Sequence, residues 1–150
     1  MSGVRILGIG SPSGDDQAGW LVVDALLAGG MRAGEALVIE KLDRPGAGLI
    51  GLLGGADRVI LVDAMQSHGQ PGRLARFDQK DWPRYGHGLS SHGFGVLAAL
   101  TLARELDGLP SRLELYGIEI AAAHPGAAPR PEIQAAARQL AAIIAASLGG

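Results

Sequence analysis

The sequence predicts an α/β protein, a three-layer α/β/α sandwich around a mostly parallel sheet of five strands. Segments typical of strands and helices follow one another in the order β-α-β-α-β-β-α-β-α, which favours this class. The strongest strand segment, RVILV at residues 58–62, is apolar throughout, as expected for a parallel strand covered on both faces. A chain of 150 residues with 47% hydrophobic residues fits one domain over residues 1–150.

The first half of the chain contains three predicted strands and two predicted helices. They are a strand at 4–9, a helix at 17–28, a strand at 36–42, a helix at 49–53 and a strand at 58–62. The first strand is a short apolar run that ends in glycines, and the polar turn SPSGDD separates it from an amphipathic segment. Gly29 and Gly30 end the first helix, and Gly54 and Gly55 end the second.

The second half contains two more strands and two longer helices. They are a strand at 72–77, an irregular connection at 79–89, a helix at 92–106, a strand at 113–120 and a helix at 132–148. The segment GRLARF is more polar than the other strands, which predicts an edge position, and LELYGIEI alternates as a strand does. Pro131 suits the first turn of the closing Ala-rich helix.

Composition narrows the range of functions. The 13 Lys and Arg nearly balance the 15 Asp and Glu, so a nucleic-acid partner is not expected. The chain has no Cys, which excludes a disulfide framework, a thiolate nucleophile and Cys-based metal sites. No uncharged apolar stretch reaches the ~18 residues of a membrane span, and no signal peptide is evident. We therefore expect a cytoplasmic monomer without a membrane partner.

The glycine-rich turn at residues 8–19, GIGSPSGDDQAG, begins like a phosphate-binding loop. A dinucleotide fingerprint requires G-x-G-x-x-G, but Ser13 occupies the third glycine position. Asp15 and Asp16 follow, and two carboxylates there would repel a pyrophosphate. A nucleotide-binding module is therefore disfavoured. The same two aspartates are suited to the N-cap or first turn of the following helix.

Three polar residues follow predicted strands or precede the next helix at the same edge of the sheet. Asp16 follows the first strand, Asp63 ends the third, and His92 precedes the helix after the fourth. Ligands of α/β sheets bind beyond the carboxyl ends of the strands. Two carboxylates and one imidazole there form a facial O,O,N set for a divalent transition metal.

Other interpretations of these residues remain open from their spacing alone. Asp63 can cap the next turn, and His92 can lie in a helix N-cap neighbourhood with Ser90 or Ser91 as the cap. The two aspartates can form an acid dyad that shares a proton. A metal is the better use of the same groups, because it polarises a carbonyl and activates water at neutral pH.

The chain resembles the hydrogenase maturation endopeptidases, which process the large subunit of [NiFe] hydrogenases. The resemblance lies in five segments that occur in the same order and at similar spacing in that family. They are GIGSPSGDDQAG, LDRPGAGL, VILVDAM, SSHGFGVLAAL and YGIEI, and the resemblance covers about residues 5–120. It implies a phosphorylase/hydrolase-like fold and a cytoplasmic, metal-dependent or aspartic-type protease. Such a protease binds nickel already inserted in the precursor of the large subunit and removes a short C-terminal peptide.

The resemblance implies that Asp16, Asp63 and His92 are the nickel ligands and the catalytic residues, with the nickel supplied by the substrate precursor. The sequence departs from the family pattern at three places. Ser11 replaces the usual Asn, Asp16 replaces the Glu of some members, and AAAHPGAAPRPEI replaces the usual Gly-x-Ser/Thr-Pro-x-Val run. The alternative function is a nickel-dependent chaperone that binds the precursor without cleaving it.

Overall fold

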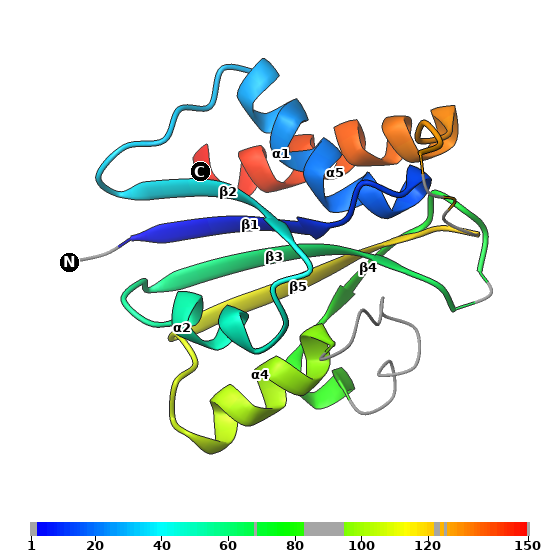
Figure 1. Ribbon diagram of the computed structural model, residues 1–150. Helices are drawn as coiled ribbons and strands as arrows, with labels where there is room; N and C mark the ends of the chain where they lie inside the picture. Colours follow the sequence, from blue (N-terminus) through cyan, green and yellow to red (C-terminus); the bar gives the residue numbers. More distant parts are fainter. Residues whose placement is uncertain (1–2, 68, 83–94, 122–123, 125, 150) are drawn as a thin grey trace.

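The computed structural model describes residues 3–67, 69–82, 95–121, 124 and 126–149. Its centre is a five-stranded sheet with the strand order β2-β1-β3-β5-β4 (Figure 1). The strands are β1 (Val4–Gly10), β2 (Leu37–Asp43), β3 (Arg58–Met65), β4 (Leu74–Phe77) and β5 (Arg112–Glu119). All neighbouring strands are parallel except β4, which runs antiparallel to β5 at the edge predicted from its polarity.

Helices cover both faces of this sheet. The helical elements are η1 (Gly14–Gln17), α1 (Ala18–Ala28), η2 (Gly46–Gly48), α2 (Leu49–Leu53), η3 (Gln79–Asp81), α4 (Val96–Glu105) and α5 (Pro131–Gly149). Helices α1 and α5 pack together on one face, and α2 and α4 pack together on the other (Figure 1). The predicted three-layer α/β/α class is confirmed.

The core consists of two apolar layers separated by the sheet. Alternation along β3 places Ile60, Val62 and Ala64 in the layer under α1 and α5, whereas Leu61 and Met65 belong to the layer under α2 and α4. Every residue of β3 is buried. The continuous apolar run that predicted a central strand is therefore explained, because each face of β3 contacts a separate helix layer.

We expect Ile60→Val to lower the free energy of unfolding by about 1 kcal/mol. Ile60 is fully buried at the centre of the sheet, so the lost methyl group leaves a small void. The matched control is Ile143→Val, because Ile143 lies on α5 with 45% of its surface exposed. Urea unfolding of both variants measures the difference. Equal losses of stability would contradict the placement of Ile60 in the core and of Ile143 at the surface.

The predicted end of the third strand is wrong. Strand β3 continues to Met65, so Asp63 lies within the strand and does not end it. The reason is that the neighbouring β5 extends far enough to pair with Asp63, Ala64 and Met65, whereas pairing with β1 stops at Val62. The segment predicted as one helix from residue 17 is preceded by a separate 3₁₀ turn, η1. Of the helix predicted at 92–106, the structure describes α4, and residues 92–94 lie outside the described part.

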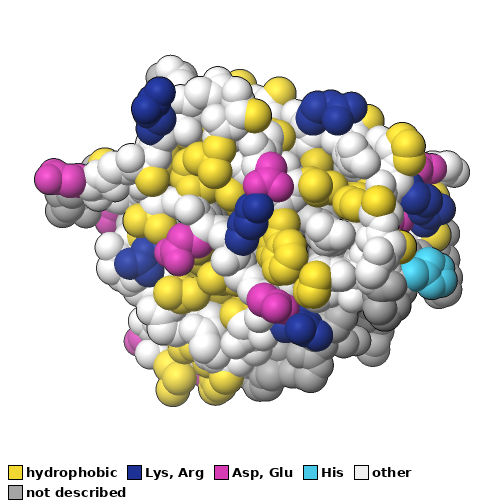
Figure 2. Space-filling view, turned by 45° about the horizontal axis from the view of Figure 1, so that its top comes forward, with side chains coloured by type: hydrophobic (Ala, Val, Ile, Leu, Met, Phe, Trp, Pro, Cys, Tyr) yellow, Lys and Arg dark blue, Asp and Glu magenta, His cyan; other side chains and the backbone are white. Residues whose placement is uncertain are grey.

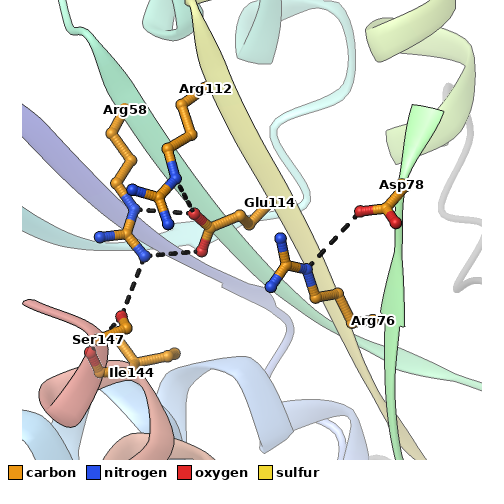
Figure 3. A network of polar contacts seen from close by, with 7 residues as sticks. All are labelled: Arg58, Arg76, Asp78, Arg112, Glu114, Ile144 and Ser147. Carbon is orange, nitrogen blue, oxygen red and sulfur yellow. Dashed lines mark hydrogen bonds and ion pairs between the residues drawn. The ribbon is translucent and has the colours of Figure 1, made fainter.

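A buried ion pair joins the amino ends of β3 and β5 to the last turns of α5 (Figure 3). The Arg58 guanidinium donates to both carboxylate oxygens of Glu114, at 2.8 and 2.9 Å, and to the Ser147 hydroxyl. Arg112 pairs with the same carboxylate at 2.9 Å from the solvent side. This network fastens α5 to the end of the sheet opposite the residues that were predicted to be functional.

Within the described residues, no helix is long and apolar enough to cross a membrane. On the face shown in Figure 2, the described Lys and Arg side chains lie among Asp, Glu and apolar side chains, and no broad area carries charge of one sign.

Candidate active site

The candidate site lies where β1 and β3 end, at the point where the direction of the chain across the sheet changes. From β1 the chain crosses through α1 to β2 on one side, and it returns through α2 to β3 on the other side of β1. Such a switch point leaves a crevice beyond the carboxyl ends of the two central strands. The turn after β1 contains Asp16, and the last part of β3 contains Asp63.

Glycines allow the turn after β1 to approach β3 closely. A Cβ atom on Gly19 would lie 2.3 Å from the carbonyl oxygen of Ile9 and 2.6 Å from that of Val62. A Cβ atom on Gly8 would lie 2.3 Å from the carbonyl oxygen of Gly19. Any side chain at these positions would push η1 and the start of α1 away from the sheet. The glycines of GIGSPSGDDQAG therefore allow the turn that carries Asp16 to lie beside β3.

Asp16 is buried at this junction, with 3% of its surface exposed. The Ser11 hydroxyl donates a hydrogen bond to its Oδ2 atom. The backbone N–H of Asp16 donates to the Ser13 carbonyl oxygen at 2.9 Å, and the N–H of Ser11 donates to the carbonyl oxygen of Asp16 at 3.3 Å. Ser11 thus restrains both the backbone and the carboxylate of Asp16.

Asp63 is also buried, with 1% of its surface exposed. Its Oδ1 atom accepts a hydrogen bond from the N–H of Ala64 at 2.8 Å, and its Oδ2 atom has no hydrogen-bond partner among the described residues. Burial, and then the negative charge of Asp16, raise the pKa of Asp63 well above its ordinary value, although the Ala64 N–H opposes this. A buried acceptor of this kind is costly unless a proton or a cation reaches it.

The face of β3 that carries Asp63 is the one on which the third predicted ligand is expected. By strand alternation Asp63 shares its face with Leu61 and Met65, which lie under α2 and α4. His92 comes four residues before the start of α4 in the sequence. His92 itself lies outside the described residues, so its position beside the two carboxylates stays a prediction. Within the described part of the chain, no three His, Cys, Asp or Glu residues are grouped as metal ligands.

Asp15 lies in the first turn of η1, one of the two positions predicted for it, although no side-chain cap bond is made at the N-terminus of η1 or α1. Its carboxylate accepts two hydrogen bonds from Arg130, from the backbone N–H and from Nε, each at 2.8 Å. Arg130 is 115 residues away in the sequence, and no local pattern marks it as a partner. The contact borders a hollow of about 250 Å³ lined by Asp15, Ala121, His124, Ala127, Ala128 and Arg130.

The turn after β2 places a cation near the site. Arg44 has a left-handed backbone with φ of 44°, and its N–H donates to the carbonyl oxygen of Gly10 at 3.1 Å. Its side chain pairs with Asp43 at 2.7 Å, and Asp43 is the main cause of its raised pKa, to which the charge of Asp16 also contributes. The segment LDRPGAGL, which carries part of the family resemblance, contains this turn, but no sequence pattern marks Arg44.

Another buried carboxylate, that of Glu119, stabilises the connection from β3 to β4. It accepts hydrogen bonds from the Ser67 backbone N–H at 2.7 Å, from the Ser67 hydroxyl and from Arg73 at 3.3 Å. Burial acts to raise the pKa of Glu119, but these hydrogen bonds together lower it, so the carboxylate is stabilised in its charged form. Glu119 therefore has its partners within the protein, in contrast to Oδ2 of Asp63.

Fold and site together define an α/β protein with two buried, adjacent carboxylates at the switch point of a mostly parallel sheet. The sequence profile of the HycI family, described as hydrogenase maturation protease, matches residues 44–147. The chain therefore belongs to the hydrogenase maturation protease family. The matched range includes Asp63 and His92, whereas Asp16 precedes it.

Solved structures of the same fold agree with this assignment. The hydrogenase maturating endopeptidase HybD from Escherichia coli is 23% identical, with a TM-score of 0.83 over 97% of this chain and 91% of that chain. The [NiFe] hydrogenase maturation protease HycI from Thermococcus kodakarensis KOD1 is 23% identical, with a TM-score of 0.75 over 99% of this chain and 94% of that chain. No curated protein sequence matches significantly.

Proposed function

We propose that this chain is an endopeptidase that recognises nickel in the precursor of a [NiFe] hydrogenase large subunit and removes its C-terminal peptide. The observation that carries the proposal is the buried Oδ2 atom of Asp63, which has no hydrogen-bond partner among the described residues and is close enough to Asp16 to have its pKa raised by that charge. Membership in the hydrogenase maturation protease family supports the reaction class.

The proposed ligands are carboxylate oxygens of Asp16 and Asp63 and a ring nitrogen of His92. A cation bound between the carboxylates would relieve both the mutual repulsion of their charges and the desolvation of Asp63. Ser11 and the N–H of Ala64 hold one oxygen of each carboxylate, which orients the pair before the substrate arrives. Three protein ligands leave positions open for ligands from the precursor.

Hydrolysis of the peptide bond requires a polarised carbonyl group and an activated water molecule, and a metal ion can supply both. The nickel belongs to the substrate, so it also identifies the precursor that is ready for cleavage. The buried carboxylates exclude bulk water from their own oxygens. A nickel-free precursor lacks the positive charge of the metal, which would attract the C-terminal segment of the precursor to the two carboxylates in this crevice.

The proposal is tested by incubating the purified chain with nickel-loaded and nickel-free precursor and measuring the mass of the large subunit. We expect only the loaded precursor to lose its C-terminal peptide. Cleavage of the nickel-free precursor at the same rate would contradict nickel recognition. Formation of a stable complex with the loaded precursor, without a change of mass, would contradict the endopeptidase and favour the non-cleaving chaperone.

A further inference from the structure

We infer that the contact between Asp15 and Arg130 is a positioning device, which holds the turn bearing Asp16 against β3. This inference rests on the proposed function of Asp16 as a ligand of the substrate's nickel. The two neighbouring aspartates of the motif would then have separate tasks. Asp16 faces the substrate site, and Asp15 anchors the turn.

The contact between Asp15 and Arg130 is buried on the Asp15 side and consists of two hydrogen bonds. The Asp15 carboxylate is buried, with 2% of its side chain exposed, and each of its oxygens accepts one hydrogen bond of 2.8 Å from Arg130. One donor is a backbone N–H, so the carboxylate is tied to the main chain as well as to the flexible guanidinium group. Charge-assisted hydrogen bonds of this kind are stronger than neutral ones and fix direction.

The far end of the anchor is rigid. The carbonyl oxygen of Arg130 accepts hydrogen bonds from the N–H groups of Ile133 and Gln134, at 3.0 and 3.1 Å, which begin helix α5. Side chains along α5 are buried in the apolar layer that α5 shares with α1. The turn η1 is therefore fastened to a helix of 19 residues that is itself packed on the sheet.

The position of this turn sets the position of Asp16. Asp16 is buried where η1 contacts β3, and a Cβ atom on Gly19 would lie 2.6 Å from the carbonyl oxygen of Val62, so the segment packs closely against that strand. Ser11 restrains Asp16 from within the same turn, whereas Arg130 restrains the turn from outside it. A shift of about 1 Å in a reacting group can cost on the order of 10²-fold in rate.

Arg130→Leu tests this role, with Arg112→Leu as the matched control. Arg112 also donates from Nε to a buried carboxylate, at 2.9 Å, and its side chain is 60% exposed against 44% for Arg130. Its partner Glu114 lies at the opposite end of the sheet and keeps its two hydrogen bonds from Arg58. Both variants lose an ion pair to a buried carboxylate. Only Arg130→Leu also loses the side-chain bond that restrains the turn η1, while the backbone bond to Asp15 remains.

We expect Arg130→Leu to lower kcat for the nickel-loaded precursor at least tenfold, with KM changed less than about twofold. Arg112→Leu should keep kcat, and Arg130→Lys, which restores a positive charge opposite Asp15, should recover part of the loss. The backbone N–H of residue 130 is present in both Arg130 variants. Hydrogen exchange of the Asp16 amide should be faster in Arg130→Leu than in Arg112→Leu. Equal kcat in Arg130→Leu and the unchanged protein, or equal losses in Arg130→Leu and Arg112→Leu, would overturn the inference.

The two proposals fail in different ways. If the unchanged protein does not cleave the loaded precursor, the proposed endopeptidase function is wrong, and the exchange of the Asp16 amide still decides whether Arg130 holds the turn. If the unchanged protein cleaves and Arg130→Leu cleaves equally fast, the function stands and the anchor is wrong.

Discussion

Asp63→Asn should abolish removal of the C-terminal peptide and at the same time make the chain harder to unfold. The loss of activity is expected to be at least about 10³-fold, because an amide would supply no charge to the nickel that Asp63 is proposed to bind. The gain in stability, on the order of 1 kcal/mol at pH 7, follows because a neutral side chain replaces a buried carboxyl that has an unpartnered oxygen and a like charge beside it.

The gain in stability should depend on pH. The pKa of Asp63 is raised in the folded chain, so the native state holds this proton more tightly than the unfolded chain does. The stabilisation that comes from binding this proton is complete below about pH 4, the ordinary pKa range of an aspartate. It is lost as the pH rises through the raised pKa of Asp63. The stability difference between Asp63→Asn and the unchanged protein should therefore grow between pH 4 and pH 8.

Urea unfolding of the metal-free proteins across that range measures the effect. Asp24→Asn is the control, because Asp24 lies on the neighbouring α1 with 51% of its side chain exposed. Asp24→Asn should retain peptide removal and show no such growth with pH. Normal cleavage by Asp63→Asn would show that Asp63 is not part of the site. A stability advantage of Asp63→Asn over the unchanged protein that shrinks from pH 4 to pH 8 would contradict the raised pKa of Asp63.

The second large effect is expected at Gly19, where alanine should cost about 3 kcal/mol of stability or more. The added Cβ atom would meet the backbone carbonyl oxygens of Ile9 and Val62 at 2.3 and 2.6 Å, and backbone atoms cannot rotate away as side chains can. Because the displaced segment carries Asp16, cleavage by any folded fraction should fall as well.

Gly51→Ala is the control, and its expected effect on stability has the opposite sign. Gly51 lies within α2, and a Cβ atom built there has no neighbour within 4 Å. Alanine in a helix interior is favoured over glycine by roughly 0.5–1 kcal/mol, so this variant should be more stable. Thermal unfolding of both variants gives the comparison. Equal stability of Gly19→Ala and the unchanged protein would mean that η1 and α1 do not pack against the sheet as described.

The sequence was sufficient to predict the fold class, the order of the elements and the edge position of β4, because apolar periodicity and glycine turns are local signals. The sequence did not show that Asp63 lies inside β3. The end of that strand depends on pairing with β5, which begins about fifty residues later in the chain.

The sequence predicted which residues belong to the candidate site but not the contacts that hold them. The resemblance named Asp16 and Asp63, and the structure brings both to the switch point as buried neighbours. The sequence does not show that the neighbouring Asp15 contacts Arg130, because the two residues are 115 positions apart in the chain. Arg44 was missed because its effect on Asp16 arises from a turn after a different strand.

The central claim is that Asp16, Asp63 and His92 together hold the nickel of the precursor. The most direct measurement is a crystal structure of the chain soaked with Ni²⁺ or Cd²⁺. We expect one ion bound by a carboxylate oxygen of Asp16, a carboxylate oxygen of Asp63 and a ring nitrogen of His92, with further coordination positions left open. An ion bound by other residues, with Asp16 and Asp63 both out of its coordination sphere, would contradict the central claim.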